Sequence, residues 1–199
     1  MSKSEREAWN RRYGEGSHHS TKPDPFLLQA FKDYIGPEFP HGGAALDVAG
    51  GVGRHAIWLA RRNWKVTLID ISEVGLEKAR RNAGDVAGRI SFVAADLQEL
   101  SRRSLAGPFR RSAYDLVLVF FYLERGLFPL VLGSLKPGGF LVYKTYTLEQ
   151  RKFPGGPSHP LHLLKPNELL EAFSSLRVLH YRETVRERGI GELLARKKR

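Results

Sequence analysis

The segment that most constrains the fold is residues 44–60, which read AALDVAGGVGRHAIWLA. Residues 44–48, which are apolar except for Asp47, are followed by a glycine-rich turn and then by apolar residues at helical spacing. A run of this length suits a buried parallel strand, and glycines permit the positive φ and close backbone approach of a tight turn. The segment therefore predicts a strand, a turn that faces a ligand, and a helix. A purely structural turn is the alternative.

The residues of this turn discriminate between ligands. In order, they are Asp47, Val48, Ala49, Gly50, Gly51, Val52 and Gly53. The dinucleotide fingerprint G-x-G-x-x-G does not fit, because residues 54–56 stand where its last small residue is needed. An acid at the end of the strand repels a pyrophosphate and attracts an ammonium group. The turn thus favours a zwitterionic ligand, and an NAD-dependent oxidoreductase of similar topology is the less favoured reading.

Two more acids follow predicted strands. Asp70 ends the strand expected at residues 65–70, and Asp96 closely follows the strand expected at 89–94. Ligands of open α/β sheets bind beyond the carboxyl ends of the strands, and an acid about 20 residues after the turn suits both hydroxyls of a ribose. Asp70 could instead cap the next helix, for which Ser72 is a plausible N-cap. A carboxylate at Asp96 can accept a hydrogen bond from an exocyclic amine such as that of adenine.

The remaining pattern alternates strands with helices, which predicts a doubly wound α/β fold. We expect seven strands in a mostly parallel sheet, with an antiparallel C-terminal strand at 190–196; a helix is the alternative there. The other strands are expected at 44–48, 65–70, 89–94, 114–121, 140–145 and 176–183, and the helices at 5–13, 25–34, 53–62, 72–83, 123–135 and 166–173.

Three local features sharpen these boundaries. The helix from residue 25 should end before Gly36-Pro37 and bury the stripe that includes Tyr34. Residues 136–139, KPGG, should form a tight turn before the fifth central strand. The length of 199 residues suits one domain over residues 1–199, with cap helices in 1–36 and a core in 44–199.

Composition excludes several classes of site. With no cysteine, the chain has no disulfide, thiolate metal site or cysteine nucleophile. His18-His19 has no acidic or histidine partner nearby, so we expect no metal site. No run approaches the ~18–20 apolar residues of a membrane span, and the charged N-terminus lacks the apolar core of a signal peptide. We therefore expect a cytoplasmic protein with no membrane partner.

The net charge of +11 is the most distinctive feature of the composition. Such a surface attracts polyanions, so a nucleic acid is a possible partner. The basic residues, however, are scattered as pairs, and only residues 196–199, RKKR, form a cluster. Dispersed pairs on helix faces are usually solvated, and oligomeric state cannot be read from the pattern.

Taken together, the motifs resemble those of class I S-adenosylmethionine-dependent methyltransferases, and most of all the small tellurite-resistance and thiopurine-type branch. The resemblance rests on LDVAGGVGRHAIWLA, VTLIDIS, FVAADLQEL, YDLVLVFFYLER and LKPGGFLVYKTYT. It implies S-adenosylmethionine as cofactor and direct in-line methyl transfer, in which the protein mainly supplies proximity and alignment. Ala49 stands where the family has its first motif glycine.

The resemblance also implies roles for individual residues. The turn with Asp47 would surround the methionine portion, Asp70 would bind the ribose, and Asp96 would bind the adenine amine. Trp9 and Tyr13, at i and i+4 of a helix, would cover the cofactor or simply dock that helix. The implied cofactor-binding set is Trp9, Tyr13, Asp47, Ala49, Gly50, Gly51, Gly53, Asp70, Ile71, Asp96, Leu97 and Phe120, and Phe121, Tyr122 and Tyr146 would line the acceptor mouth.

The acceptor is less constrained, and no catalytic residue is assigned. The segment 120–123, FFYL, lacks the D/N-P-P-aromatic motif with which similar enzymes methylate exocyclic amines of bases or glutamine. Ribose, carboxyl, thiol and small-molecule acceptors stay open. A small-molecule acceptor is preferred, and an RNA-binding or RNA-modifying methyltransferase that uses the basic surface is the alternative.

Overall fold

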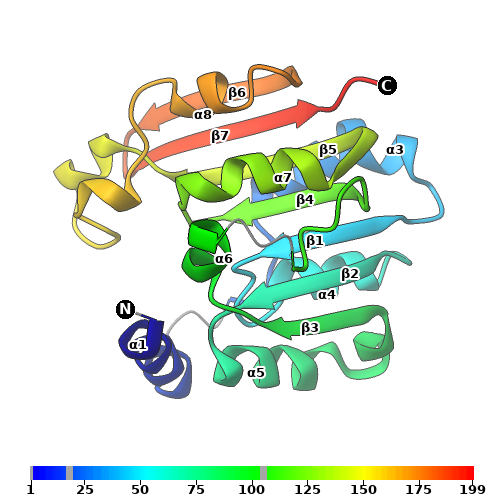
Figure 1. Cartoon of the computed structure of the whole chain (residues 1–199), viewed down its shortest axis with the longest axis horizontal. Coiled ribbons are helices and arrows are strands. Elements are labelled where there is room, and N and C mark those ends of the chain that lie inside the picture. The colour runs from blue at the N-terminus through cyan, green and yellow to red at the C-terminus, as the bar shows by residue number, and fades with distance from the viewer. Residues whose placement is uncertain (1, 17–19, 104–106) are drawn as a thin grey trace.

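A seven-stranded sheet organises the chain in the order β3-β2-β1-β4-β5-β7-β6 (Figure 1). The computed structural model describes residues 2–16, 20–103 and 107–199. The first five strands in this order, β3-β2-β1-β4-β5, pair in parallel with their neighbours. Strand β7 runs antiparallel to both β5 and β6. The strands are β1 (Ala44–Val48), β2 (Lys65–Asp70), β3 (Ile90–Ala94), β4 (Tyr114–Phe120), β5 (Leu135–Tyr146), β6 (Arg177–Val185) and β7 (Gly189–Arg196). The predicted fold class and the strand at the C-terminal end are confirmed.

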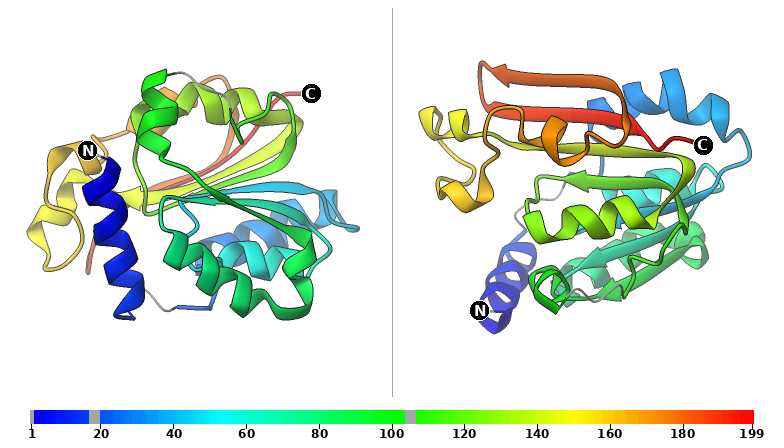
Figure 2. Two further views of the ribbon diagram at one scale, coloured as in Figure 1. Left: turned by 60° about the horizontal axis from the view of Figure 1, so that its bottom comes forward. Right: turned by 45° about the horizontal axis from the view of Figure 1, so that its top comes forward.

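Helices cover both faces of the sheet (Figure 2). Side chains of α2, α4 and α5 form one core cluster with the sheet, and side chains of α6, α7 and α8 form the other. The helices are α1 (Ser2–Gly14), α2 (Pro25–Ala30), α3 (Gly36–Glu38), α4 (Arg54–Ala60), α5 (Glu73–Ala83), α6 (Leu97–Arg103), α7 (Phe128–Ser134) and α8 (Glu168–Ala172). Shorter turns are the π-helical η1 (Phe31–Ile35) and the 3₁₀ segments η2 (Gly84–Arg89), η3 (Arg125–Leu127), η4 (Leu148–Lys152) and η5 (Pro160–His162).

The carboxyl ends of β1 to β4 meet at one edge of the sheet, called here the carboxyl edge. Helix α1 lies beside this edge and packs against α5, and the segment 148–163 flanks the same side of the molecule (Figures 1 and 2). Asn10 fastens α1, because its side-chain oxygen accepts a hydrogen bond from Ser72 Oγ at 2.6 Å. The fold thus encloses the carboxyl edge between the N-terminal helix and a later loop.

The predicted end of the second helix at Gly36-Pro37 is wrong. The chain continues through η1 into α3, and the amide of Gly36 donates to the carbonyl of Phe31, five residues back. This wider turn shifts the register, so that Pro37 occupies the first turn of the next helical segment, where its missing amide hydrogen is tolerated. Tyr34, expected in the core, is 39% exposed because the same turn rotates it outward.

Two boundaries near β5 also differ from the prediction. The helix expected over 123–135 is split, and α7 begins only at Phe128, which places Pro129 in its first turn. The expected turn at 136–139 lies inside β5, where the pairing jumps from Tyr114↔Leu135 to Leu116↔Phe140. These residues form an irregular insertion in the strand, and Gly138 supplies its positive φ of 80°.

The sequence analysis expected no metal site and no membrane-spanning helix. His18 and His19 lie outside the described residues. Within the described ranges, no three metal-ligating side chains converge on one point. None of the helices described has the length and apolar character needed to cross a membrane.

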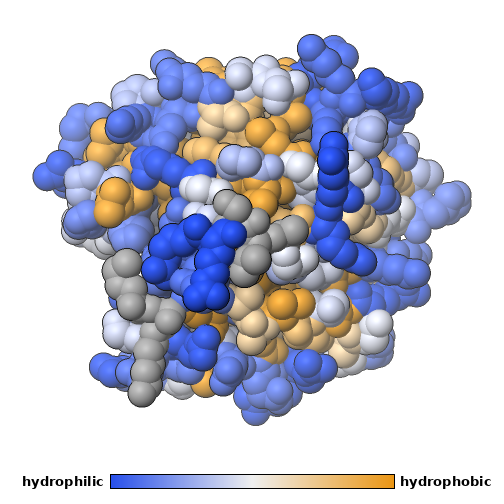
Figure 3. Space-filling view, in the orientation of Figure 1, coloured by the Kyte–Doolittle hydropathy of each residue, from blue (hydrophilic) through white to orange (hydrophobic). Residues whose placement is uncertain are grey.

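The face shown in Figure 3 is hydrophilic around its rim and apolar near its centre. Part of the basic charge is engaged in local ion pairs along helices, such as Arg81 with Glu77 on α5 and Arg103 with Glu99 on α6. Because these pairs are solvent-exposed, each contributes little to stability.

Candidate functional site

The glycine-rich turn after β1 is held in an unusual backbone conformation. Ala49, Gly51 and Gly53 have φ values of 54°, 55° and 77°. For alanine this left-handed conformation costs about 1–2 kcal/mol. The amide of Gly50 donates to the carbonyl of Ile69 at 3.0 Å, which ties the turn to β2. The neighbouring strand thus keeps the turn in its strained shape.

Glycine is required at two positions because other groups approach closely. A Cβ on Gly50 would lie 2.8 Å from Asp47 Oδ2, and a Cβ on Gly51 would collide with the hydroxyl of Tyr13. A side chain at either position would displace a residue of the candidate site.

Asp47 lies beneath the turn and is 1% exposed. Its Oδ2 accepts a hydrogen bond from the amide of Ala56 at 3.1 Å, whereas its buried Oδ1 has no hydrogen-bond partner among the described residues. Burial raises the pKa of Asp47 to about 7, although the Ala56 amide and Arg54 act in the opposite direction. An enclosed carboxylate oxygen without a partner fits a site that receives a positively charged group.

Asp70 joins the turn after β1 to the turn after β2. Its Oδ2 accepts from the amide of Gly51 at 2.8 Å, and its Oδ1 accepts from the amide of Ser72 at 2.9 Å. Burial raises the pKa of Asp70 to about 6 against the effect of these amides. Ser72 is the N-cap of α5, as predicted, because its hydroxyl accepts from the amide of Gly75 at 3.0 Å. Ile71 follows Asp70 at the same edge and is half-buried.

Helix α1 presents three side chains, spaced four residues apart, toward the carboxyl edge. Tyr13 is 8% exposed, and its ring contacts both Gly51 and Gly75. Trp9 stacks on Tyr13 with a centroid distance of 5.6 Å. Burial and the nearby Asp96 raise the pKa of Glu5 on the same side of the helix. The structure therefore places both predicted aromatic residues over the turn, and their contact with a cofactor stays a prediction.

Asp96 and Leu97, which follow β3, have different roles: the first caps a helix and the second packs in the core. Asp96 caps α6, since its Oδ1 accepts from the amides of Gln98 at 3.0 Å and Glu99 at 3.1 Å. The side chain of Leu97 is 4% exposed and belongs to the second core cluster. Of this pair, only Asp96 has a side chain that is partly accessible to a ligand.

The aromatic residues after β4 do not form one group. Phe120 is 7% exposed, and its ring packs on the His55 ring at 4.2 Å. Phe121 has a φ of 56°, which turns its ring toward that of Tyr146 at 5.1 Å. Tyr122 lies apart from both, where burial and the nearby Glu124 raise the pKa of its hydroxyl. The structure thus brings Phe121 and Tyr146 together and leaves Phe120 in the core. That Phe121 and Tyr146 line an acceptor mouth stays a prediction.

A half-buried lysine that the sequence analysis did not identify lies next to Phe121. Lys144 Nζ is 3.0 Å from both Asp24 Oδ1 and Glu192 Oε1, and it lies 5.8 Å from the centroid of the Phe121 ring. Glu192 also pairs with Arg182 at 2.7 Å. The signal for Lys144 was a single charge within the apolar strand sequence FLVYKTY.

Lys144 also forms part of a groove between α2 and the strands β5, β7 and β6. This groove has a volume of about 470 Å³, within the range of small-molecule pockets. Phe26, His180 and Leu194 contribute to its walls.

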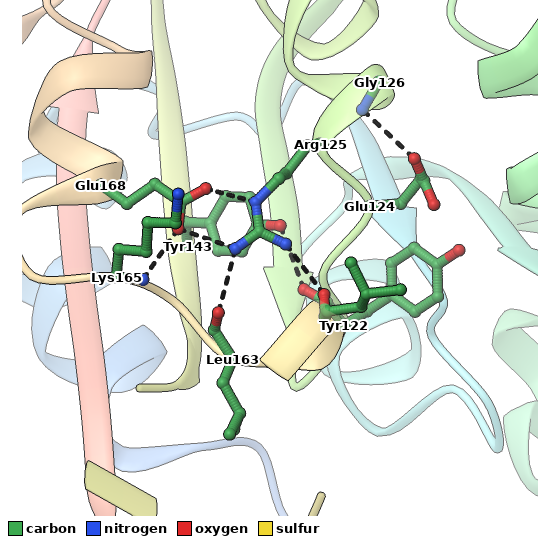
Figure 4. A network of polar contacts seen from close by, with 9 residues as sticks. Tyr122, Glu124, Arg125, Gly126, Tyr143, Leu163, Lys165 and Glu168 are labelled. Atoms are coloured by element: carbon green, nitrogen blue, oxygen red, sulfur yellow. Dashed lines mark hydrogen bonds and ion pairs between the residues drawn. The ribbon is translucent and has the colours of Figure 1, made fainter. Parts of the chain in front are cut away.

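Arg125 fixes the loop that flanks the carboxyl edge (Figure 4). Its guanidinium contacts both carboxylate oxygens of Glu168, at 2.5 and 2.9 Å, and donates to the carbonyls of Leu161 and Leu163. Tyr143 Oη donates to the carbonyl of Tyr122 at 3.0 Å. These bonds connect the segment after β4 to the segment before α8.

The central part of the chain is similar to a known protein family. Residues 45–139 match the family described as "Methyltransferase domain". The S-adenosyl-L-methionine-dependent Diels-Alderase iliD of Neonectria sp. (strain DH2) is 33% identical over 107 residues. This match covers 52% of the chain but only 38% of iliD, so the chain spans less than half of that relative.

Solved structures share the fold at low sequence identity. TehB from Haemophilus influenzae has a TM-score of 0.71 and 19% identity, and the match covers 94% of this chain and 66% of TehB. The 1,6-didemethyltoxoflavin-N1-methyltransferase of Burkholderia thailandensis has a TM-score of 0.65 and 17% identity, with 98% and 87% covered. That structure contains 1,6-didemethyltoxoflavin and S-adenosylhomocysteine.

Proposed function

We propose that this chain, a class I S-adenosylmethionine-dependent methyltransferase by its matched domain and its fold, transfers the methyl group of that cofactor to a small-molecule acceptor. The observation that carries the proposal is the pair of buried carboxylates at the carboxyl edge. Asp47 has a carboxylate oxygen without a partner among the described residues, and Asp70 is held by two backbone amides beside the glycine turn.

In this proposal, different acidic residues bind different parts of the cofactor. Asp47 supplies negative charge beside the ammonium group, Asp70 binds the ribose hydroxyls, and Asp96 binds the adenine amine. Trp9 and Tyr13 exclude water from the turn. When bound, the cofactor would supply a methyl group attached to a sulfonium sulfur. Transfer of that methyl group leaves a neutral thioether, which is an excellent leaving group.

The small-molecule class is supported by the enclosure of the acceptor mouth. The rings of Phe121 and Tyr146 lie 5.1 Å apart, where β4 and β5 end. Arg125 holds in place the segment 148–163, which follows β5. In-line transfer depends on alignment, and the paired aromatic rings would align a small acceptor. The Burkholderia neighbour, which contains a small heterocycle, supports the same class.

The first test is calorimetric titration of the purified protein with S-adenosylhomocysteine, with NAD as the control ligand. We expect micromolar binding at one site per chain and no competition from NAD. Absence of S-adenosylhomocysteine binding by folded protein would contradict the proposal. Because the Neonectria relative is a Diels-Alderase, methyl transfer is measured separately, with labelled cofactor and a panel of small thiols, acids and amines before RNA.

A further inference from the structure

His55, the second residue of α4, lies between the glycine turn and the acceptor mouth. It is 2% exposed and packs on the ring of Phe120. Its Nδ1 is 3.9 Å from Asp47 Oδ1, and its Nε2 accepts a hydrogen bond from the amide of Asp24 at 3.3 Å. The sequence assigned His55 no role beyond the turn segment.

The contact with Asp24 determines which ring nitrogen carries the proton. Burial, followed by the nearby cations Arg54 and Lys144, lowers the pKa of His55 well below its usual value, so the ring is neutral. A neutral imidazole whose Nε2 accepts a hydrogen bond carries its hydrogen on Nδ1. The nitrogen that carries this hydrogen lies 3.9 Å from the enclosed Oδ1 of Asp47.

We propose that His55 is a positioning residue for the cofactor, because its Nδ1–H orients and stabilises the ionised carboxylate of Asp47 beneath the glycine turn. This role rests on the proposed function. A movement of about 1 Å brings the two atoms within hydrogen-bond distance. The positive charge of the cofactor favours ionised Asp47, and the ionised carboxylate attracts the N–H, so each contact strengthens the other.

The same ring connects the turn to the mouth. Asp24 Oδ1 accepts from the amide of Phe26 at 2.9 Å and pairs with Lys144, whose ammonium group lies beside the mouth. His55 therefore joins Asp47 to the start of α2 through its two nitrogens.

The test compares two replacements of His55 by titration with S-adenosylhomocysteine at pH 6.5 and pH 9. His55→Leu removes both nitrogens, and His55→Asn restores an N–H donor near the place of Nδ1. We expect His55→Leu to weaken binding by roughly 10- to 100-fold at pH 6.5, the effect of one hydrogen bond to a charged group. His55→Asn should stay within about threefold of the wild type, on the same reasoning.

The pH dependence separates positioning from general structural damage. Besides His55, the charged and titratable groups that face Asp47 are Arg54 on α4, Asp70 on β2 and Tyr13 on α1. Since loss of the N–H disfavours ionised Asp47, the defect of His55→Leu should shrink at pH 9, where the carboxylate ionises without help. Equal defects at both pH values, or an asparagine variant as weak as the leucine variant, would overturn the inference.

A second measurement does not depend on the cofactor. In ¹⁵N-labelled ligand-free protein, the long-range proton–nitrogen spectrum of His55 should show a neutral ring with its hydrogen on Nδ1 between pH 6 and 8. A hydrogen on Nε2 or a charged ring would refute the role of His55. Failure of the wild type to bind S-adenosylhomocysteine would instead refute the proposed function.

Discussion

The two halves of the sheet stabilise their buried carboxylates in opposite ways. On the β1–β2 side, Asp47 and Asp70 accept hydrogen bonds from backbone amides, and burial raises the pKa of both. On the β5–β7 side, Asp24 and Glu192 share the ammonium group of Lys144. Among the described residues, no cation directly contacts the carboxylates of the first half, whereas Lys144 neutralises those of the second half.

This difference separates binding from architecture. A buried carboxylate that lacks a cation costs stability in the free protein and gains it when a cationic ligand arrives. A carboxylate already paired with lysine would gain no comparable stability from a cationic ligand. Its ion pair instead holds secondary-structure elements in place. We therefore expect changes on the β1–β2 side to alter cofactor affinity and changes on the β5–β7 side to alter stability.

The largest effect should follow removal of the shared cation. Lys144→Met leaves the buried Asp24 without a cation and leaves Glu192 with Arg182 alone, which should lower the free energy of unfolding by about 3–5 kcal/mol. Urea unfolding measures the loss, and Lys65→Met, at an exposed position of β2, is the matched control. Adding Glu192→Gln should recover part of the stability. A loss below about 1 kcal/mol would mean that the pairing in this half is weak.

Asp47 should have a smaller effect, which appears in the pH dependence of the free energy of unfolding. In the folded protein its pKa is about 7, against a reference value of 3.8. The folded state therefore retains a proton that the unfolded state releases, so this residue lowers stability as pH rises from about 4 to 7, by on the order of 3 kcal/mol. Ligand-free Asp47→Asn should escape this decline. Parallel curves of unfolding free energy against pH for the two proteins would contradict the proposed state of Asp47.

Replacement of Asp70 tests the binding half directly. Asp70→Ala should weaken S-adenosylhomocysteine binding by about 1–3 kcal/mol through loss of charge-assisted hydrogen bonds. Calorimetry measures the change, and Asp85→Ala, an exposed acid in η2, serves as the control. Unchanged affinity in a folded Asp70 variant would refute the ribose assignment.

The smallest effect is expected at the exposed end of the paired half. The side chain of Arg182 is 61% exposed, although its partner Glu192 is buried. Arg182→Ala should change stability by less than about 1 kcal/mol, because Lys144 still compensates Glu192. A loss above about 2 kcal/mol in urea unfolding would show that the pairing extends to the surface.

Much of the β1–β2 side could be predicted from the sequence. The strand at 65–70 has the expected bounds, and Ser72 caps α5. The assignment to class I methyltransferases, made from short motifs in this half and in β4 and β5, agrees with the matched domain. These features depend on turn chemistry and apolar runs, which act over a few residues.

Predictions were less accurate where distant segments meet. The sequence did not indicate that the ring of Phe120 packs on His55 in the core, and its assignment to the cofactor stays a prediction. The KPGG segment was expected as a turn, but pairing with β4 draws it into β5. Lys144 went unnoticed because its partner Asp24 lies 120 positions earlier in the chain.

The sequence by itself determined the strand–turn–helix unit, the acids at the carboxyl ends of β1, β2 and β3, and the order of strands and helices. Those properties follow from local periodicity and from the backbone freedom of glycine. Only the tertiary structure decided which carboxylates receive a cation, which aromatic ring lies beside Phe121, and which nitrogen of His55 points to Asp47. Each depends on contacts between segments far apart in the chain, and packing of the whole sheet brings them together.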